Sequence, residues 1–264
     1  MTFDPFADFR MTGHNAIVTG GAQNIGLAIA RTFAAAGANV MIAGRNGDKA
    51  AAAAAEISRE TGRDVRGIAC DVTSQDDIVR CVDTTVKAFG GVSTLVNNVG
   101  WGRAYDDPLA VSAEDMIEAY KLNTLSAMQM TAACRPHLLK AKNATVTNSG
   151  SLVGVLPAFD FIAYSAAKAA LNHLMLGLAH HFAKQVRINT ILIGTVLTPG
   201  YADAGLDAKA QEALAHPNNL TGRAGAPQDV ANAFLWLASN AGSWVSGQTI
   251  QVAGGGTRVR LKPE

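Results

Sequence analysis

The sequence predicts a doubly wound α/β fold, in which a parallel sheet of about seven strands carries helices on both faces. Short apolar runs alternate along the chain with longer segments of helical character. The short runs are rich in apolar residues, as expected for strands buried on both faces of a parallel sheet. The chain has 264 residues with no internal repeat or linker, so we expect one domain over residues 1–264.

The expected strands are runs of four or five residues, rich in Val, Ile, Ala and Thr. Most are followed by Gly, Asn or Asp, which are depleted in strand interiors. The strands cover residues 16–19, 40–43, 65–69, 94–97, 144–147, 187–191 and 249–252.

The expected helices fill the intervals between strands. Six consecutive alanines at residues 50–55 favour helix, because alanine has the highest intrinsic helix propensity. The segment at about 198–222 mixes Pro, Gly and polar residues, and we expect it to be a mobile flap over the substrate. The helices cover residues 25–36, 47–61, 75–89, two stretches across 113–140, 162–183 and 227–239.

The composition argues against several classes of protein. With 22 basic and 21 acidic residues, the chain lacks the basic excess of a nucleic-acid binder. Cys70, Cys81 and Cys134 are far apart, which argues against a disulfide framework or a zinc site and favours a reducing compartment. The chain has no secretory signal and no run of about 20 apolar residues that would span a bilayer. We expect a cytoplasmic protein without a metal.

Tyr164 and Lys168 lie four residues apart in an alanine-rich helical segment, so they share one helix face. A phenol with a pKa of about 10 is a poor acid–base catalyst at neutral pH. An ammonium about 4.5 Å away, at an effective dielectric constant of about 20, supplies roughly 4 kcal/mol. That is enough to lower the pKa of Tyr164 to about 7. Taken alone, the pattern also fits a solvated lysine beside a packed tyrosine.

A glycine-rich turn at residues 19–26 joins the first expected strand to the first expected helix. Glycines there let the backbone approach a pyrophosphate, which the positive end of the helix attracts. A tight turn without a ligand is the other interpretation of this motif alone.

Together with Ser149-Gly150-Ser151, these motifs make residues 12–256 resemble the short-chain dehydrogenase/reductase family. The resemblance implies a single Rossmann-type domain. The family's glycine motif is T-G-x-x-x-G-x-G, and this chain has Asn24 in place of the middle glycine. Asparagine tolerates left-handed backbone better than most residues, so we expect the turn to survive.

The resemblance implies hydride transfer between a nicotinamide cofactor and a secondary alcohol or ketone. Tyr164 would give or take the proton, and Lys168 would lower its pKa and bind the nicotinamide ribose. Ser151, thirteen residues before the tyrosine, would hydrogen-bond the substrate oxygen, with Ser149 as its rival. Asn123 would hold a water that connects the lysine to solvent.

The same resemblance implies the cofactor contacts. Asp71 and Val72 would contact the adenine, and residues 193–198 would close on the nicotinamide. The implied cofactor-binding residues are Gly20, Gln23, Asn24, Ile25, Gly26, Arg45, Asn46, Asp71, Val72, Asn97, Tyr164, Lys168, Gly194, Val196 and Thr198.

The end of the second strand bears on cofactor choice. An NAD-type site places Asp or Glu near Gly44 to bind the ribose hydroxyls, but no carboxylate occurs before Asp48. Arg45 instead offers a fork of donors that suits a phosphate. We therefore expect NADP(H), with NAD(H) as the alternative.

Aromatic and aliphatic residues expected around the pocket favour a small-molecule substrate that is apolar or cyclic. Residues 222–233 and 243–248 resemble bacterial hydroxysteroid dehydrogenases. A 3-oxoacyl thioester reductase is the alternative enzyme, and a catalytically inactive nucleotide-sensing regulator is the alternative of another class. The expected pocket residues are Trp101, Tyr105, Val153, Val155, Leu156, Phe159, Phe161 and Tyr201.

We also expect a homotetramer. Family members commonly pair through two long helices, here about 113–140 and 162–183, and through the last helix and strand. The second of these helices carries apolar residues on more than one side, which would leave a patch exposed on a monomer. These residues are Leu171, Leu174, Met175, Leu176, Leu178 and Phe182.

Overall fold

The structure, a computed structural model, describes residues 4–198 and 220–255. Seven strands form one parallel sheet in the order β3-β2-β1-β4-β5-β6-β7. The predicted parallel sheet with helices on both faces is therefore confirmed. The strands are β1 (Asn15–Thr19), β2 (Asn39–Gly44), β3 (Val65–Ala69), β4 (Thr94–Asn97), β5 (Ala144–Ser151), β6 (Val186–Ile193) and β7 (Thr249–Val252).

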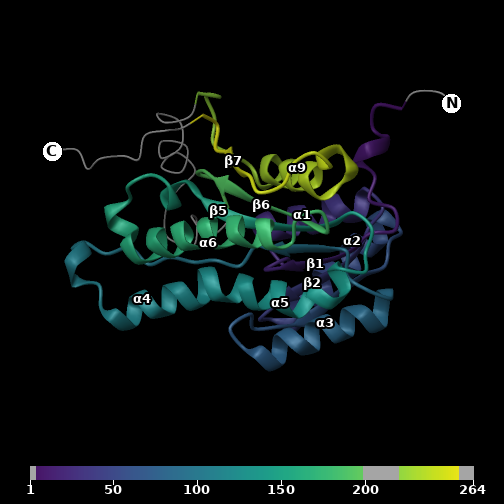
Figure 1. Ribbon diagram of the computed structural model, residues 1–264, viewed down its shortest axis with the longest axis horizontal. Coiled ribbons are helices and arrows are strands. Elements are labelled where there is room, and N and C mark those ends of the chain that lie inside the picture. The colour runs from purple at the N-terminus through teal and green to yellow at the C-terminus, as the bar shows by residue number, and fades with distance from the viewer. Residues whose placement is uncertain (1–3, 199–219, 256–264) are drawn as a thin grey trace.

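Helices pack on both faces of the sheet, and Figure 1 shows α9 and α3 on opposite sides of the strands. One core cluster joins α1, α2 and α9 to one face, and a second joins α3, α5 and α6 to the other. Each face buries apolar side chains of the same strands, as Val18 on one face and Ile17 on the other show for β1. The helices are α1 (Asn24–Ala35), α2 (Gly47–Thr61), α3 (Gln75–Phe89), α4 (Ala113–Tyr120), α5 (Ser126–Leu138), α6 (Ile162–His181) and α9 (Pro227–Ala238).

Two strands extend beyond their apolar runs. β5 continues from the expected 144–147 to Ser151, and β6 reaches Ile193. Register explains the extension, because Ser149 pairs with Ile191 and Ser151 pairs with Ile193 along parallel strands. Backbone pairing thus carries a polar segment to the edge of the sheet, where its hydroxyls become available to a site.

The two helical stretches expected across 113–140 are α4 and α5, joined by the π-helical turn η3 (Lys121–Leu125). π-Helical turns are rare and occur frequently at functional sites. The remaining short elements are 3₁₀ turns: η1 (Ala7–Phe9), η2 (Pro108–Ala110), η4 (Leu152–Gly154), η5 (Phe159–Phe161) and η7 (Asn240–Gly242).

The strand order reverses at β1, which lies between β2 and β4. Connections leave these strands in opposite directions, so a crevice opens at their carboxyl ends. The glycine turn follows β1, Arg45 follows β2 and Asp71 follows β3 by two residues. The fold therefore gathers the predicted binding residues at one edge of the sheet.

Most of the expected flap, residues 199–219, lies outside the described residues. Among the helices that the structure describes, none is long and apolar enough to cross a membrane.

Candidate functional site

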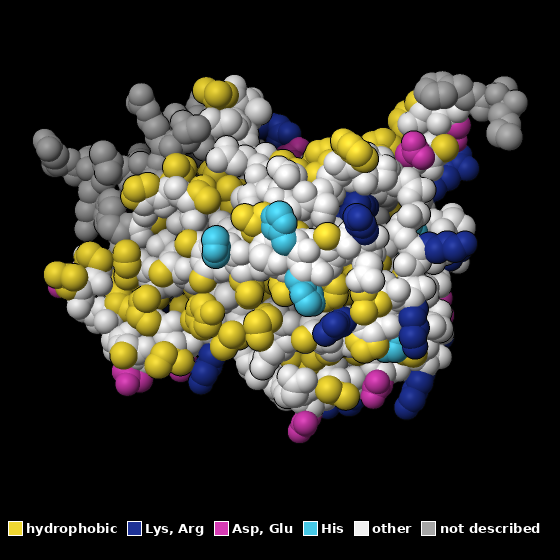
Figure 2. All heavy atoms as spheres, in the orientation of Figure 1, with side chains coloured by type: hydrophobic (Ala, Val, Ile, Leu, Met, Phe, Trp, Pro, Cys, Tyr) yellow, Lys and Arg dark blue, Asp and Glu magenta, His cyan; other side chains and the backbone are white. Residues whose placement is uncertain are grey.

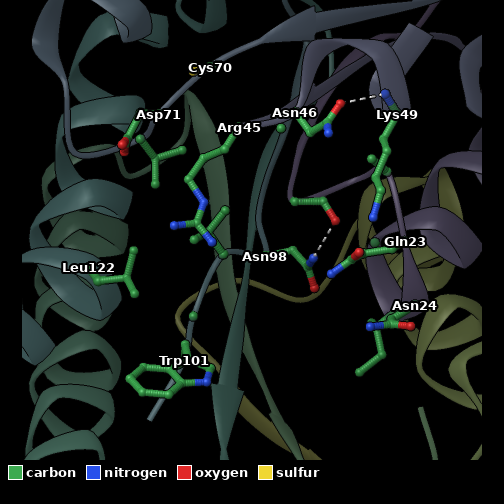
Figure 3. Close-up of a pocket in the computed structure, with 18 of the residues that line it drawn as sticks. Gln23, Asn24, Arg45, Asn46, Lys49, Cys70, Asp71, Asn98, Trp101 and Leu122 are labelled. Carbon is green, nitrogen blue, oxygen red and sulfur yellow. Dashed lines mark hydrogen bonds between the residues drawn. The ribbon is translucent and has the colours of Figure 1, made fainter. Parts of the chain in front are cut away.

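A cavity of about 600 Å³ lies at the carboxyl ends of β1 to β4. Its walls come from the turn after β1, the start of α2 and the segments that follow β3 and β4. Figure 3 shows Arg45 and Lys49 pointing into this space, with Trp101 at the opposite end of the view from Asn46. The cavity coincides with the crevice where sheets of this topology bind nucleotides.

The glycine turn gives the cavity a tight phosphate cradle. Gly20 and Asn24 have φ angles of 63° and 52°, so asparagine adopts the left-handed conformation that was expected of it. A Cβ atom on Gly26 would collide with the carbonyl oxygen of Gly20 and lie 2.7 Å from Nδ2 of Asn98. Gln23, the residue before α1, makes no side-chain cap. The first N–H groups of α1 are thus left for an anion.

Asn98 connects the glycine turn to the serine segment. Its Nδ2 donates to the carbonyl oxygens of Thr19 and Gly20, at 3.2 and 3.4 Å. Its Oδ1 accepts a 2.9 Å hydrogen bond from the Ser149 hydroxyl. The Asn98 side chain therefore links the end of β1 to the carboxyl end of β5.

Asn97, predicted to bind the cofactor, does not line the cavity. Its buried Nδ2 donates to Oδ1 of Asn148 at 2.9 Å and to Oγ1 of Thr131 at 3.3 Å. Consecutive residues of a strand point to opposite faces, so Asn97 turns inward where Asn98 turns to the cavity. Of the two asparagines, Asn98 is therefore the one that lines the cavity, while Asn97 links β4 to β5 and α5.

Two cations and one carboxylate line the cavity near the ends of β2 and β3. Arg45 and Lys49 form no salt bridge within the described residues. The backbone N–H and hydroxyl of Thr73 lower the pKa of Asp71, and Arg45 contributes to the same shift. Asn46 caps α2 by accepting from the backbone N–H of Lys49 at 2.9 Å, which fixes the first turn and the root of that lysine.

Tyr164 and Lys168 share a face of α6, as predicted. Lys168 is buried, its Nζ lies 5.6 Å from the centroid of the Tyr164 ring, and it donates to the Ser149 carbonyl oxygen at 2.8 Å. Burial lowers the pKa of Lys168 to about 8, so the ammonium form predominates at pH 7. The ring of Phe161 meets Tyr164 edge-on at 6.5 Å between centroids.

The segment after β4 brings this pair to the cavity. A Cβ atom on Gly100, which lines the cavity, would lie 2.6 Å from Lys168 Nζ and 2.8 Å from Asn123 Oδ1. A Cβ atom on Gly102 would lie 2.6 Å from Cβ and Cγ of Tyr164. The glycines therefore allow the backbone to lie directly against both side chains.

Asn123 sits in the π-helical turn η3 and is buried. Its Oδ1 accepts from the backbone N–H of Trp101, and its Nδ2 donates to the carbonyl oxygens of Trp101 and Ala119. The side chain thus anchors Trp101, which is 66% exposed at the edge of the cavity.

Ser149 and Ser151 differ in their environments. The Ser149 hydroxyl is buried and donates to Asn98. Ser151 is the last residue of β5 and is only partly buried. A substrate can hydrogen-bond to the Ser151 hydroxyl without breaking the hydrogen bond from Ser149 to Asn98.

The cavity contains ten of the predicted cofactor residues: Gly20, Gln23, Asn24, Ile25, Gly26, Arg45, Asn46, Asp71, Val72 and Thr198. Besides Asn97, the predicted residues outside its lining are Tyr164, Lys168, Gly194 and Val196. Trp101 was expected as a substrate residue, whereas sequence reasoning missed Ala22, Gly44, Lys49, Cys70, Thr73, Asn98, Val99, Gly100 and Leu122. Closeness in sequence could have identified these residues, because each lies within four positions of a predicted site residue.

The expected substrate residues are dispersed around Tyr164. Val155 is 51% exposed and Phe161 is 37% exposed, while Tyr105 carries the guanidinium of Arg103 over its ring at 5.4 Å. Tyr201 lies outside the described residues. No group of three or more His, Cys, Asp or Glu side chains that could hold a metal ion occurs in the described part of the chain.

Comparisons with known proteins agree on one family. The sequence profile described as Enoyl-(Acyl carrier protein) reductase matches residues 20–257. A 7alpha-hydroxysteroid dehydrogenase of Escherichia coli strain K12 is 34% identical over 254 residues, or 95% of this chain and 97% of that protein.

Solved structures give the same result. A 7alpha-hydroxysteroid dehydrogenase complexed with NADH and 7-oxo glycochenodeoxycholic acid superposes with a TM-score of 0.89 at 32% identity, covering 97% of this chain and 98% of that one. L-sorbose reductase from Gluconobacter frateurii, complexed with NADPH and L-sorbose, has a TM-score of 0.89 at 26% identity and covers 96% and 100% of the two chains.

Proposed function

Since the chain belongs to the short-chain dehydrogenase/reductase family, we propose that Ser151, Tyr164, Lys168 and Asn123 form its active site and that its cofactor is NADP(H). Membership makes it an oxidoreductase that acts on an alcohol or ketone with a nicotinamide cofactor. One observation carries the assignment of the site. The buried Lys168 ammonium lies beside Tyr164 and against Gly100, which lines the cavity.

The roles follow from chemistry and position. The Tyr164 hydroxyl donates or accepts the proton at the substrate oxygen, and the positive charge of Lys168 favours the phenolate. Ser151 donates a hydrogen bond to the same oxygen as negative charge develops on it. Asn123 holds Trp101 and the Lys168 environment in place. The bound cofactor supplies the hydride donor or acceptor.

The residues present fit a phosphorylated dinucleotide. Gly26 lets the start of α1 pack directly against the Gly20 carbonyl, and the α1 N–H groups left without a side-chain cap can then face a pyrophosphate. Arg45 and Lys49 bring two positive charges to the cavity at the end of β2 and the start of α2, against one carboxylate in its lining, that of Asp71. This charge balance favours a 2′-phosphate and supports NADP(H) over NAD(H).

Titration of the wild-type protein with both cofactors tests this choice. We expect NADPH to bind more tightly than NADH, and the double change Gly44→Asp with Arg45→Ala to shift preference toward NADH. The new aspartate repels a 2′-phosphate and accepts from ribose hydroxyls, while the arginine contact is removed. Tighter binding of NADH to the wild type would overturn the proposal.

We place an apolar, cyclic ketone or its alcohol in the space beside Tyr164. The partly exposed Trp101, Val155 and Phe161 support an apolar substrate, as does the likeness to a 7alpha-hydroxysteroid dehydrogenase. The second candidate is a 3-oxoacyl thioester, which the acyl-carrier description of the matching profile favours. An NADPH-consumption screen over steroid, quinone, cyclic-ketone and 3-oxoacyl substrates separates the two. Absence of turnover with all of them would favour the inactive nucleotide-sensing regulator.

We also propose that the protein forms a homotetramer and is located in the cytoplasm. Figure 2 shows apolar side chains gathered over α4 and α6 on one face. The exposed apolar residues include Met116, Ile117, Tyr120, Ile162 and Leu176. Leu171 and Met175, two apolar residues of α6, are instead buried against the sheet. The patch is therefore smaller on α6 than the sequence suggested and includes α4. The three free cysteines fit a reducing compartment.

A further inference from the structure

Asn172 extends the functional face of α6. It follows Tyr164 and Lys168 at a spacing of four residues each, so the three side chains lie along one side of the helix. Both polar atoms of its amide, Oδ1 and Nδ2, are shielded from solvent and have no hydrogen-bond partner among the described residues. Buried amides normally have partners, and an unpaired one destabilises the fold, so this side chain needs an explanation.

The amide lies between two glycines of the segment that carries Ser151. A Cβ atom on Gly150 would lie 3.0 Å from Oδ1 of Asn172, and one on Gly154 would lie 3.1 Å from its Nδ2. Gly150 directly precedes Ser151, and Gly154 ends the turn η4 that follows it. The acceptor and the donor of one side chain thus contact the backbone on either side of the serine.

Lys168 reaches the same segment one residue earlier, where its ammonium donates to the Ser149 carbonyl oxygen. Two successive turns of α6 therefore pack against residues 149–154. Lys168 forms a hydrogen bond to this segment, whereas the Asn172 amide lies next to it without a hydrogen bond. A small shift of the segment would bring its backbone N–H and C=O groups into bonding geometry with Asn172.

We propose that Asn172 is a positioning residue for Ser151, whose amide forms hydrogen bonds to the backbone of residues 150–154 when cofactor and substrate are bound. This inference depends on the proposed catalytic role of Ser151. In the free enzyme the Asn172 amide is unpaired, so the hydrogen bonds that it gains on the shift favour the shifted position of residues 150–154. Unpaired polar groups that persist in native structures commonly serve such functional roles.

Substitution at Asn172 tests the proposal. Asn172→Leu keeps comparable bulk and removes both polar atoms, so we expect the free enzyme to unfold at the same or a higher temperature. We expect kcat to fall at least tenfold while KM for NADPH changes less than twofold, because the cofactor cavity is untouched. Asn172→Ser retains one donor and acceptor and should keep at least threefold more kcat than Asn172→Ala, which is of similar size.

His173→Leu is the matched control, because His173 is the next residue on α6 and is exposed. It should leave kcat unchanged. A kcat for Asn172→Leu within twofold of wild type would overturn the positioning role, as would equal kcat values for the serine and alanine variants.

Hydrogen exchange gives a readout that does not need turnover. In the wild type we expect NADPH together with a ketone substrate or its alcohol to slow amide exchange in residues 150–156, and in Asn172→Leu we expect this slowing to be lost. Equal slowing in both proteins would refute the inference. An inactive wild type with intact NADPH binding would instead count against the proposed function, and the exchange comparison would still decide the role of Asn172.

Discussion

The buried Lys168 ammonium makes the free energy of unfolding depend on pH in a way that one substitution can isolate. Burial lowers the pKa of this lysine from 10.5 to about 8. Below pH 8 both folded and unfolded states carry the proton, so folding bears the full cost of burying the charge. Between pH 8 and 10.5 the unfolded state binds more protons than the folded state, so stability rises with pH.

The size of the effect follows from the two pKa values. Integrating the difference in bound protons from pH 7 to 9.5 gives about 1.4 units, which corresponds to about 2 kcal/mol. Lys168→Met keeps a side chain of similar length that does not titrate. The free energy of unfolding of the wild type should therefore rise by about 2 kcal/mol relative to Lys168→Met over this range.

Equilibrium urea unfolding of both proteins at pH 7 and 9.5 measures this difference. The same pair of proteins is also compared in the Tyr164→Phe background, where no phenol coupled to Lys168 can titrate, so that comparison isolates Lys168. The exposed Lys87→Met is the control, and its difference from wild type should not vary with pH. A pH-independent difference for Lys168→Met would refute the buried ammonium. The same variant should lose at least about a hundredfold in turnover, because the charge that favours the Tyr164 phenolate is gone.

Three further predictions concern the site and the assembly. Tyr164→Phe should lower kcat by about 10²–10⁴ while NADPH binding, followed by fluorescence, stays near wild type, because the ring still packs but the exchangeable proton is absent; near-normal turnover would remove the tyrosine from the mechanism. Ser151→Ala should reduce kcat more than Ser149→Ala, whose hydroxyl is engaged by Asn98, and the reverse order in steady-state assays would reassign the serine. Light scattering should give about four times the 27.4 kDa of one chain, whereas a monomer mass would contradict the exposed apolar face as an interface.

The fold could be predicted because its signals are local. Five strands and helices have the bounds that apolar runs and turn residues indicated, namely β3, β4, β7, α2 and α3. β5 was predicted too short because the pattern ends at Thr147, while pairing with β6 continues through Ser151. Local hydrophobicity does not report pairing with a strand that lies much later in the chain. Residues 148–151, the polar half of β5, could therefore not be assigned to a strand from the sequence.

Cavity residues could be predicted where a sequence motif fixes the backbone conformation. They were missed where their position depends on how helices pack in the fold. Asn24 follows from the turn geometry, because only a few residue types accept its φ of 52°. Lys49 was missed because its approach to the cavity depends on the direction of α2, which the Asn46 cap sets. Asn172 carries no motif at all, and its two glycine neighbours are known only from the packing of α6 on the serine segment.

Asn97 belongs to a set of interior asparagines that link neighbouring strands. Asn97 on β4 donates to Oδ1 of Asn148 on β5, and Asn148 donates to the carbonyl oxygen of Asn189 on β6. Asn189 in turn donates to the Val245 carbonyl oxygen and accepts from the backbone N–H of Gln248, just before β7.

This row of amides crosses three neighbouring strands and ends at the segment before β7, where an apolar side chain would satisfy the hydrophobic pattern equally well. Its contribution is register, because a shift of β5 by one residue would move Asn148 to the opposite face and leave several buried polar groups unpaired. The same shift would separate Ser149 from Asn98 and move Ser151 away from Ile193, its partner on β6. The asparagines that touch no ligand therefore fix the position of the serine that is proposed to do so.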